Sequence, residues 1–208
     1  MNTTTNKVLL MVMLFSPFSS AAEKMTTIDS WIDNFDVRGL LSKQSLSSNE
    51  IPFQVKARID SNSWYGLYAS TMLAHELTFV DSNKFNLLQL HAQVGFKYQN
   101  DFSDAGLRIG IYSGREYMFL KSGTRLRTED VGISGAIFGE IKVSDKLWLH
   151  SSIEPESWLD GLNVDLITGL QYQLLNTLRL GGVISVELRD MKFSDYQYGA
   201  GVSLSYQF

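Results

Sequence analysis

The sequence predicts an all-β fold, a closed antiparallel up-and-down transmembrane β-barrel of about ten strands that follows a cleaved signal peptide. First, apolar and polar residues alternate with a period of two in segment after segment beyond residue 34. Second, several of these segments run about nine to thirteen residues, close to the roughly 9–11 that a tilted strand needs to cross hydrocarbon. Third, the links between segments alternate between short and long, as in a chain that weaves up and down.

The amino-terminal residues have the three-part pattern of a secretory signal peptide. A lysine precedes an apolar run at residues 8–15, and small residues follow at Ser20 and Ala22. The run is too short to span a bilayer, and the small residues suit cleavage before Glu23. Residues 1–22 are therefore assigned to a signal peptide, with an uncleaved anchor or a buried first helix as the alternative.

Residues 23–33 are expected to form a periplasmic lead-in to the barrel. Ile28, Trp31 and Ile32 lie at helical spacing, which predicts a short amphipathic helix with Trp31 at the inner headgroup level. A flexible lead-in is the alternative, because so short a helix is marginal on its own.

The barrel itself is expected over residues 34–208, with eight strands as the alternative if the first two segments pair differently. Each segment has one apolar face; for example, Phe53, Val55 and Ile59 are interleaved with Lys56 and Arg58. The ten expected strands cover residues 35–42, 53–60, 65–73, 88–98, 107–111, 131–143, 147–153, 164–174, 178–188 and 198–208.

The links between these segments fall into two groups. Short links rich in turn residues cover 60–63, 99–105, 143–146 and 175–177, and longer links cover 43–52, 74–85, 115–130, 154–162 and 190–197. With both ends of the mature chain in the periplasm, the short turns face the periplasm and the long loops face outside. The longest loop mixes aromatic and mostly basic residues, which suits contact with lipopolysaccharide phosphates but equally suits an ordinary solvated loop.

A soluble antiparallel sandwich is the main alternative fold, because it also alternates apolar and polar residues. The positions of the aromatic residues favour the membrane barrel, since they gather near strand ends, where rings meet lipid headgroups. These aromatics are Phe35, Trp64, Tyr65, Tyr98, Trp148, Trp158, Tyr196, Tyr198, Tyr206 and Phe208.

With its signal peptide, amphipathic strands and aromatic final strand, the sequence resembles the small Gram-negative outer-membrane β-barrel proteins of the OmpA/OmpX-like class. The resemblance covers essentially the whole mature chain and implies an outer-membrane location. It also implies that Tyr198, Tyr206 and Phe208 form the signal read by the barrel-assembly machinery. No diagnostic motif of the OmpA, OmpX, OmpW or omptin groups is matched residue for residue, so the subfamily stays open.

The face opposite the apolar one carries charges of both signs, and we expect it to line the lumen. The predicted lumen charge network is Arg38, Lys56, Arg58, Arg108, Glu140, Asp165, Arg179, Glu187 and Arg189, with Asp36, Asp60, His91, Lys97, Lys142 and His150 on the same face. A barrel of eight to ten strands is filled largely by its own side chains, so these charges are expected to pair across the lumen. The alternative is a narrow polar conduit or a gate of ion pairs.

His150, Ser152 and Glu154 share one strand face, and His150-x-Ser152 resembles an element of the outer-membrane lipid A deacylases. The match is small, and the alternation points these residues inward, away from lipid. The sequence contains no cysteine, and His75, Glu76, Asp81 and Asp101 are scattered over opposite ends of the barrel, so we expect no metal site and no cofactor.

The net charge of −4 gives no reason to expect a nucleic-acid partner. We expect a monomeric, non-enzymatic outer-membrane protein with a structural or surface-interaction role, whose extracellular loops meet lipopolysaccharide, another cell or a partner protein. A narrow porin-like channel for small polar solutes and a lipid A-modifying enzyme are the two alternatives.

Overall fold

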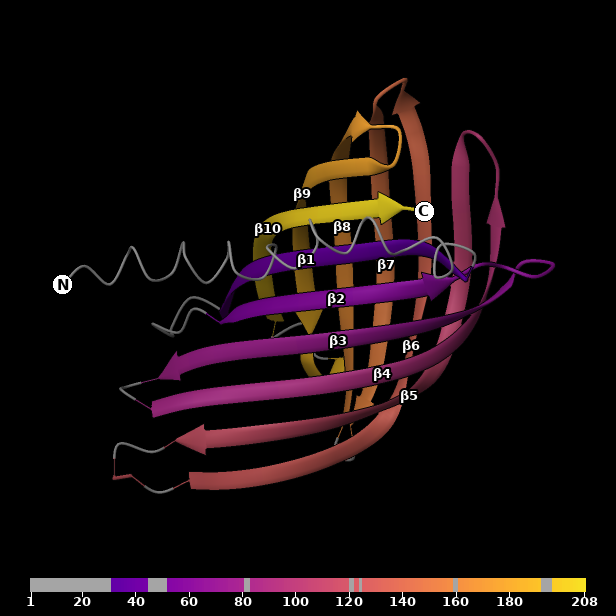
Figure 1. Cartoon of the computed structure of the whole chain (residues 1–208). Coiled ribbons are helices and arrows are strands. Elements are labelled where there is room, and N and C mark those ends of the chain that lie inside the picture. The colour runs from indigo at the N-terminus through magenta and orange to yellow at the C-terminus, as the bar shows by residue number, and fades with distance from the viewer. Residues whose placement is uncertain are drawn as a thin grey trace, which may run out of the picture.

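Ten strands hydrogen-bond to their neighbours in sequence order and close into one antiparallel barrel (Figure 1). The computed structural model describes residues 31–44, 52–80, 83–119, 122–123, 125–158, 161–191 and 196–208. The strands are β1 (Ile32–Gln44), β2 (Phe53–Ser61), β3 (Leu67–Val80), β4 (Asn83–Gln99), β5 (Ser103–Phe119), β6 (Arg125–Ser144), β7 (Leu147–Trp158), β8 (Gly161–Leu175), β9 (Leu178–Leu188) and β10 (Tyr196–Gln207), with a short 3-10 helix η1 (Arg189–Met191) between the last two. The prediction of about ten strands is confirmed, and the eight-strand alternative is wrong.

The last strand closes the barrel against the first. The β1–β10 register runs from Asn34 opposite Gln207 to Gln44 opposite Gln197. Beyond it, the Phe208 amide donates a hydrogen bond to the Asp33 carbonyl at 3.0 Å. The pairing of β1 with β10 therefore removes the two free edges of the sheet.

The strands are longer than predicted at the end of the barrel that carries the longer links, here called the hairpin end. The expected loop over 115–130 is mostly paired strand, because the β5–β6 ladder continues from Arg115 opposite Glu129 to Phe119 opposite Arg125. The expected loops over 74–85 and 154–162 are likewise mostly strand. Backbone hydrogen bonds between neighbouring strands do not depend on the alternation of apolar and polar side chains. The strands therefore stay paired beyond the residues where that alternation ends.

The barrel also begins earlier than the predicted boundary at residue 34. β1 starts at Ile32, which pairs with Ser61, so the end of the expected amphipathic helix is strand. Trp31, just before it, is exposed. The predicted signal peptide and the remainder of the lead-in lie outside the described residues.

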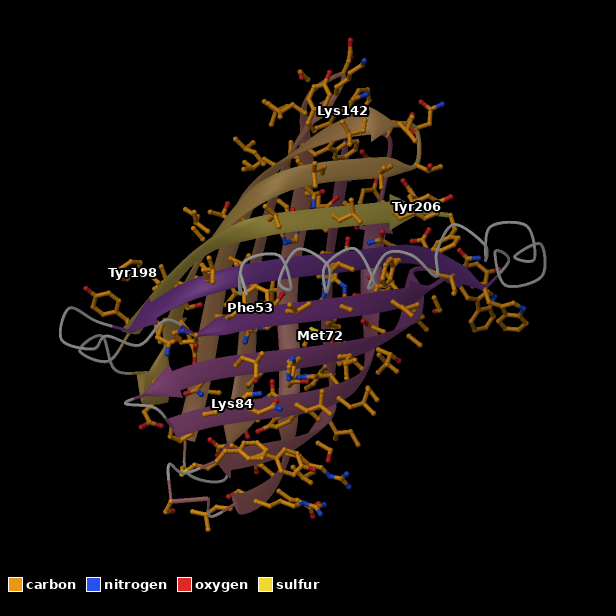
Figure 2. The ribbon with its side chains drawn as sticks, turned by 60° about the vertical axis from the view of Figure 1, so that its left-hand side comes forward. Phe53, Met72, Lys84, Lys142, Tyr198 and Tyr206 are labelled. Carbon is orange, nitrogen blue, oxygen red and sulfur yellow. The ribbon has the colours of Figure 1, made fainter. Side chains whose placement is uncertain are left out.

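The distribution of polar and apolar side chains is inverted relative to a water-soluble protein. On the outer wall Ile109, Ile111 and Ile137 are 58%, 63% and 64% exposed, whereas inside the barrel Arg108 and His91 are 4% and 0% exposed. Figure 2 shows side chains projecting from the outer wall along the strands. Within the described residues, no helix is long and apolar enough to cross a membrane.

Exposed aromatic rings gather at the end of the barrel with the short links, here called the turn end. They are Trp31, Trp64, Tyr65, Phe96, Tyr98, Phe102, Tyr172, Tyr206 and Phe208. Tyr198 lies at the opposite end of β10 from Tyr206 (Figure 2). Trp148 departs from the prediction: it is only 8% exposed and faces the lumen, because its position on β7 has inward parity.

Candidate functional site

The centre of the lumen is occupied by one carboxylate surrounded by three cations. The Glu154 side chain lies 3.3 Å from Arg38, 3.3 Å from Arg108 and 3.8 Å from Lys56, and these residues come from four different strands. The Ser152 hydroxyl donates a further hydrogen bond to Glu154 at 3.0 Å. All five side chains are buried, and together they form what we call the Glu154 cluster.

Further ion pairs extend from the cluster toward the turn end. The Arg38 guanidinium lies 2.9 Å from Nε2 of His150, whose Nδ1 lies 3.3 Å from Glu140. Glu140 also pairs with Arg179 at 2.8 Å, and the Arg179 guanidinium stacks 3.9 Å from the centroid of the Trp148 ring. The indole thus covers one side of the Arg179 guanidinium.

A separate group of ion pairs lies inside the barrel near β1 and β2. Arg58 pairs with Asp36 and, at 3.3 Å, with Asp60, while Lys97 pairs with Asp33. A buried charge is costly unless it is paired and hydrogen-bonded, so this distribution is the one that a closed polar lumen requires.

The nine residues of the predicted lumen network all point inward, but they fall into three groups. Arg38, Lys56 and Arg108 belong to the Glu154 cluster; Asp165, Glu187 and Arg189 line a cavity at the hairpin end; Arg58, Glu140 and Arg179 line a smaller one at the turn end. The prediction of the network omitted its central residue, Glu154, although the parity of β7 had already placed that residue inside.

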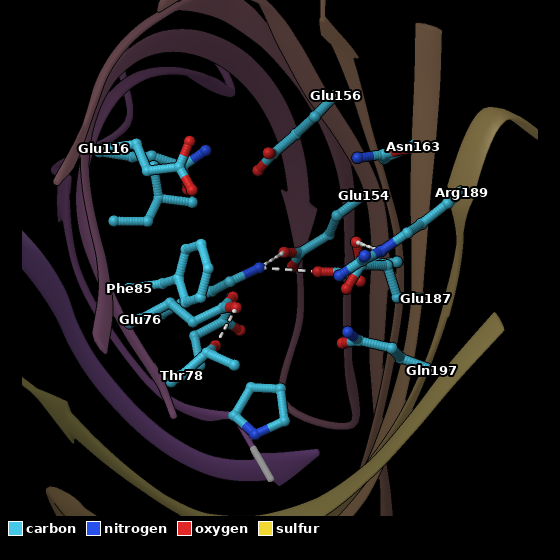
Figure 3. Close-up of a pocket in the computed structure, with 16 residues that line it drawn as sticks. Glu76, Thr78, Phe85, Glu116, Glu154, Glu156, Asn163, Glu187, Arg189 and Gln197 are labelled. Carbon is cyan, nitrogen blue, oxygen red and sulfur yellow. Dashed lines mark hydrogen bonds and ion pairs between the residues drawn. The ribbon is translucent and has the colours of Figure 1, made fainter. Parts of the chain in front are cut away.

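The cavity at the hairpin end, here called the upper cavity, has a volume of about 480 Å³. Lys56 lies on its floor, 2.8 Å from Asp165. In Figure 3, Glu76, Glu116 and Phe85 lie on one wall, facing Glu154, Glu156, Glu187 and Arg189. The Gln197 amide lies between Glu187 and Arg189, placed to donate to the first at 3.2 Å and accept from the second at 2.6 Å. Sequence reasoning missed Glu76, Glu116 and Glu156 as lumen residues, because it treated their segments as loops.

The cavity at the turn end, here called the lower cavity, has a volume of only about 50 Å³. Arg58, Asp60, Glu140, His150 and Arg179 are among its lining residues. The Glu154 cluster lies between the two cavities and fills the middle of the lumen with side chains.

The geometry at His150 and Ser152 differs from that of a hydrolase. The Ser152 hydroxyl donates to Glu154, and Nε2 of His150 contacts Arg38, so these two contacts do not join His150 to Ser152. Both side chains are 4% exposed and face the lumen. A nucleophilic serine needs a base within hydrogen-bond reach, and the group that holds this place at Ser152 is Glu154 and not His150.

The closed barrel with an apolar outer wall and a charged lumen has the fold of the outer-membrane β-barrel proteins. No family model and no curated protein sequence matches this chain. Among solved structures, the translocator domain of the autotransporter NalP from Neisseria meningitidis has a TM-score of 0.54 at 10% identity, with 98% of each chain covered.

Two further structures are outer-membrane barrels of lower similarity. Neisserial surface protein A has a TM-score of 0.46 at 11% identity, covering 86% of this chain and 97% of that one. The NanC porin has a TM-score of 0.45 at 10% identity, covering 84% of this chain and all of that one. At these identities the likeness concerns the fold alone.

Proposed function

We propose that this chain is a monomeric, non-enzymatic integral protein of the Gram-negative outer membrane that acts at the cell surface through its hairpin end. On this proposal it is exported by the signal peptide at residues 1–22. The barrel-assembly machinery then inserts it by reading Tyr198, Tyr206 and Phe208. The observation that carries the proposal is the apolar outer wall that encloses a charged lumen.

That inversion of polarity suits hydrocarbon and not water. A soluble protein rarely exposes a large contiguous apolar patch, whereas here exposed apolar side chains occur on all ten strands. In lipid the same wall is favourable, and a closed barrel satisfies every ladder hydrogen bond internally. The exposed aromatic residues that gather at the turn end lie at the position expected for a membrane–water interface.

The hairpin end carries the charges available to a surface partner. On the β5–β6 hairpin, Arg115 and Arg127 both pair with Glu129, and all three side chains are about half exposed. The hydrogen bond from Arg127 lowers the pKa of Glu129, so this carboxylate stays ionised. Arginine groups suit bidentate contact with phosphate, so lipopolysaccharide is the partner that this end fits best.

The test combines location with folding. Expressed full-length, the protein is expected in the outer-membrane fraction, and the unboiled sample is expected to migrate differently from the boiled one on a gel. Folding of the purified mature chain in buffer without detergent would contradict the proposal.

A narrow channel is the second candidate, favoured by the two cavities that lie along one lumen on either side of the Glu154 cluster. Its test is the single-channel current in a planar bilayer. A steady current that disappears when Arg58 or Arg179 is neutralised would support the channel, and silence of the wild-type protein would remove it.

Enzymatic activity on lipid A is tested by mass spectrometry of lipid A from cells expressing the wild-type protein or His150→Ala. We expect the two lipid profiles to be identical. A modified lipid A that depends on His150 would overturn the non-enzymatic proposal.

A further inference from the structure

More carboxyl groups than cationic side chains line the upper cavity. Six carboxylates and two cations line it; the carboxylates are Glu76, Glu116, Glu154, Glu156, Asp165 and Glu187, and the cations are Lys56 and Arg189. From this imbalance and the observations below we infer that the upper cavity binds an extended organic polycation, an aliphatic di- or triamine. This inference goes beyond the proposed surface role and does not depend on it.

Three of the six carboxylates already have cationic partners. Glu154 is surrounded by its cluster, Asp165 pairs with Lys56 at 2.8 Å, and Glu187 lies 3.5 Å from Arg189. Both cations that line the cavity, Lys56 and Arg189, are therefore already paired with a carboxylate.

The other three carboxylates, Glu76, Glu116 and Glu156, pair with no lysine or arginine among the residues that the structure describes. Within the described part of the chain, the hydrogen-bond donors to Glu76 are the neutral groups of Thr78, at 3.2 Å, and Gln54, at 3.4 Å. The three lie on β3, β5 and β7, on facing walls of the cavity (Figure 3). Partly desolvated carboxylates without a cation favour the entry of one.

An unpartnered polar atom lies behind the cavity wall. His91 is 0% exposed, and its ring stacks on Tyr112 with centroids 5.3 Å apart. Its Nδ1 lies 3.1 Å from the Ser134 hydroxyl, whereas Nε2 has no hydrogen-bond partner and points toward Glu156, 3.9 Å away. An ammonium group bound to the Glu156 carboxylate would lie beside this nitrogen and would supply the hydrogen-bond donor that it lacks.

The cavity also has an apolar strip, which an inorganic cation would not use. Phe85 and Leu87 project inward from β4, and Pro52 adds a third apolar surface. Phe85 lies between Glu76 and Glu116 on the same wall (Figure 3). Methylene groups between two ammonium groups would pack on this strip, and an ammonium over the ring would gain a cation–π contact.

The spacing of the acidic side chains favours an extended ligand over a compact one. Across the described ranges, no three histidine or acidic side chains come close enough to hold one metal ion. The negative charge is instead spread along a volume of about 480 Å³, which matches separated ammonium groups on one chain.

The test is calorimetric titration of the folded barrel in detergent at low ionic strength, with spermidine and with Mg²⁺ as separate titrants. We expect one spermidine per barrel and weaker binding of Mg²⁺. Glu116→Gln combined with Glu156→Gln should weaken spermidine binding by about tenfold or more. Phe85→Ala should weaken spermidine binding without changing that of Mg²⁺.

Glu129→Gln is the matched control, because it removes one carboxylate from the same hairpin but outside the cavity. It should leave spermidine binding unchanged, and heat modifiability should show that every variant is folded. The inference is overturned if spermidine does not bind, if the control weakens binding as much as the cavity variants do, or if Mg²⁺ binds as tightly as spermidine. The titration measures binding to the purified barrel and does not depend on where the protein lies in the cell. A negative result would therefore contradict the polyamine site without contradicting the outer-membrane location.

Discussion

Glu154→Gln tests whether the lumen is held by its central carboxylate. The substitution keeps the size of the side chain and its hydrogen bond with Ser152 but removes the charge that faces Arg38, Arg108 and Lys56. The substitution therefore changes the charge at this position and little else.

The expected loss of stability depends on which partners each of the three cations keeps when residue 154 loses its charge. Lys56 keeps Asp165 at 2.8 Å and Arg38 keeps His150 at 2.9 Å, but Arg108 has no other acidic partner among the described residues. Removing one partner of a buried ion pair costs about 3–5 kcal/mol, which lowers the ratio of native to unfolded protein by about two to four orders of magnitude. We expect a loss of stability within that range.

The assay is equilibrium urea unfolding of the barrel reconstituted in lipid vesicles, followed by tryptophan fluorescence. Glu129→Gln is the matched control, since it also removes a carboxylate with two arginine partners, but at the exposed β5–β6 hairpin, where little change is expected. Adding Arg108→Met to Glu154→Gln should restore part of the lost stability, because the stranded cation is removed too. A change below about 1 kcal/mol for Glu154→Gln would refute the reasoning.

Three other predictions concern packing, the outer wall and assembly. Gly95→Ala should destabilise the barrel by about 1–3 kcal/mol in the same unfolding assay, because a new Cβ would lie 2.6 Å from the Tyr68 ring; Gly182→Ala, whose nearest atom is 3.9 Å away, should be tolerated, and equal effects would contradict this account. Ile137→Lys, in the middle of the apolar wall, should cost about 2–4 kcal/mol in vesicles, whereas a harmless effect would show that this wall faces water. Phe208→Ala keeps its backbone hydrogen bond at 3.0 Å, so the purified barrel should refold normally while the heat-modifiable fraction in outer membranes falls; an unchanged fraction would remove Phe208 from the assembly signal.

Much of the architecture was predictable because alternation is a local property. A side chain on a strand points to one face or the other according to its position, so the period of two alone placed Arg38, Arg58 and Arg179 inside the barrel. The same parity should have placed Trp148 inside, yet its aromatic character suggested the girdle. The structure shows that parity prevails there: the ring is buried and stacks on the Arg179 guanidinium.

Strand ends were less predictable than strand centres. Residues 115–119 and 125–130 have no clean alternation, and their charges suggested a loop. Their backbones pair nonetheless, since each strand supplies the other's hydrogen-bond partners. The error had a consequence for the site, because Glu116 was left outside the predicted lumen.

The sequence by itself determined the number of strands, the apolar outer face and the set of charges inside, because these depend on near neighbours along the chain. Only the tertiary structure decided which charges meet. Arg38 and Glu154 are 116 residues apart and lie on β1 and β7, so their contact depends on the register and closure of the whole barrel. The same closure divides the lumen into an engaged centre and an upper cavity with unbalanced carboxylates, a distinction that no local pattern encodes.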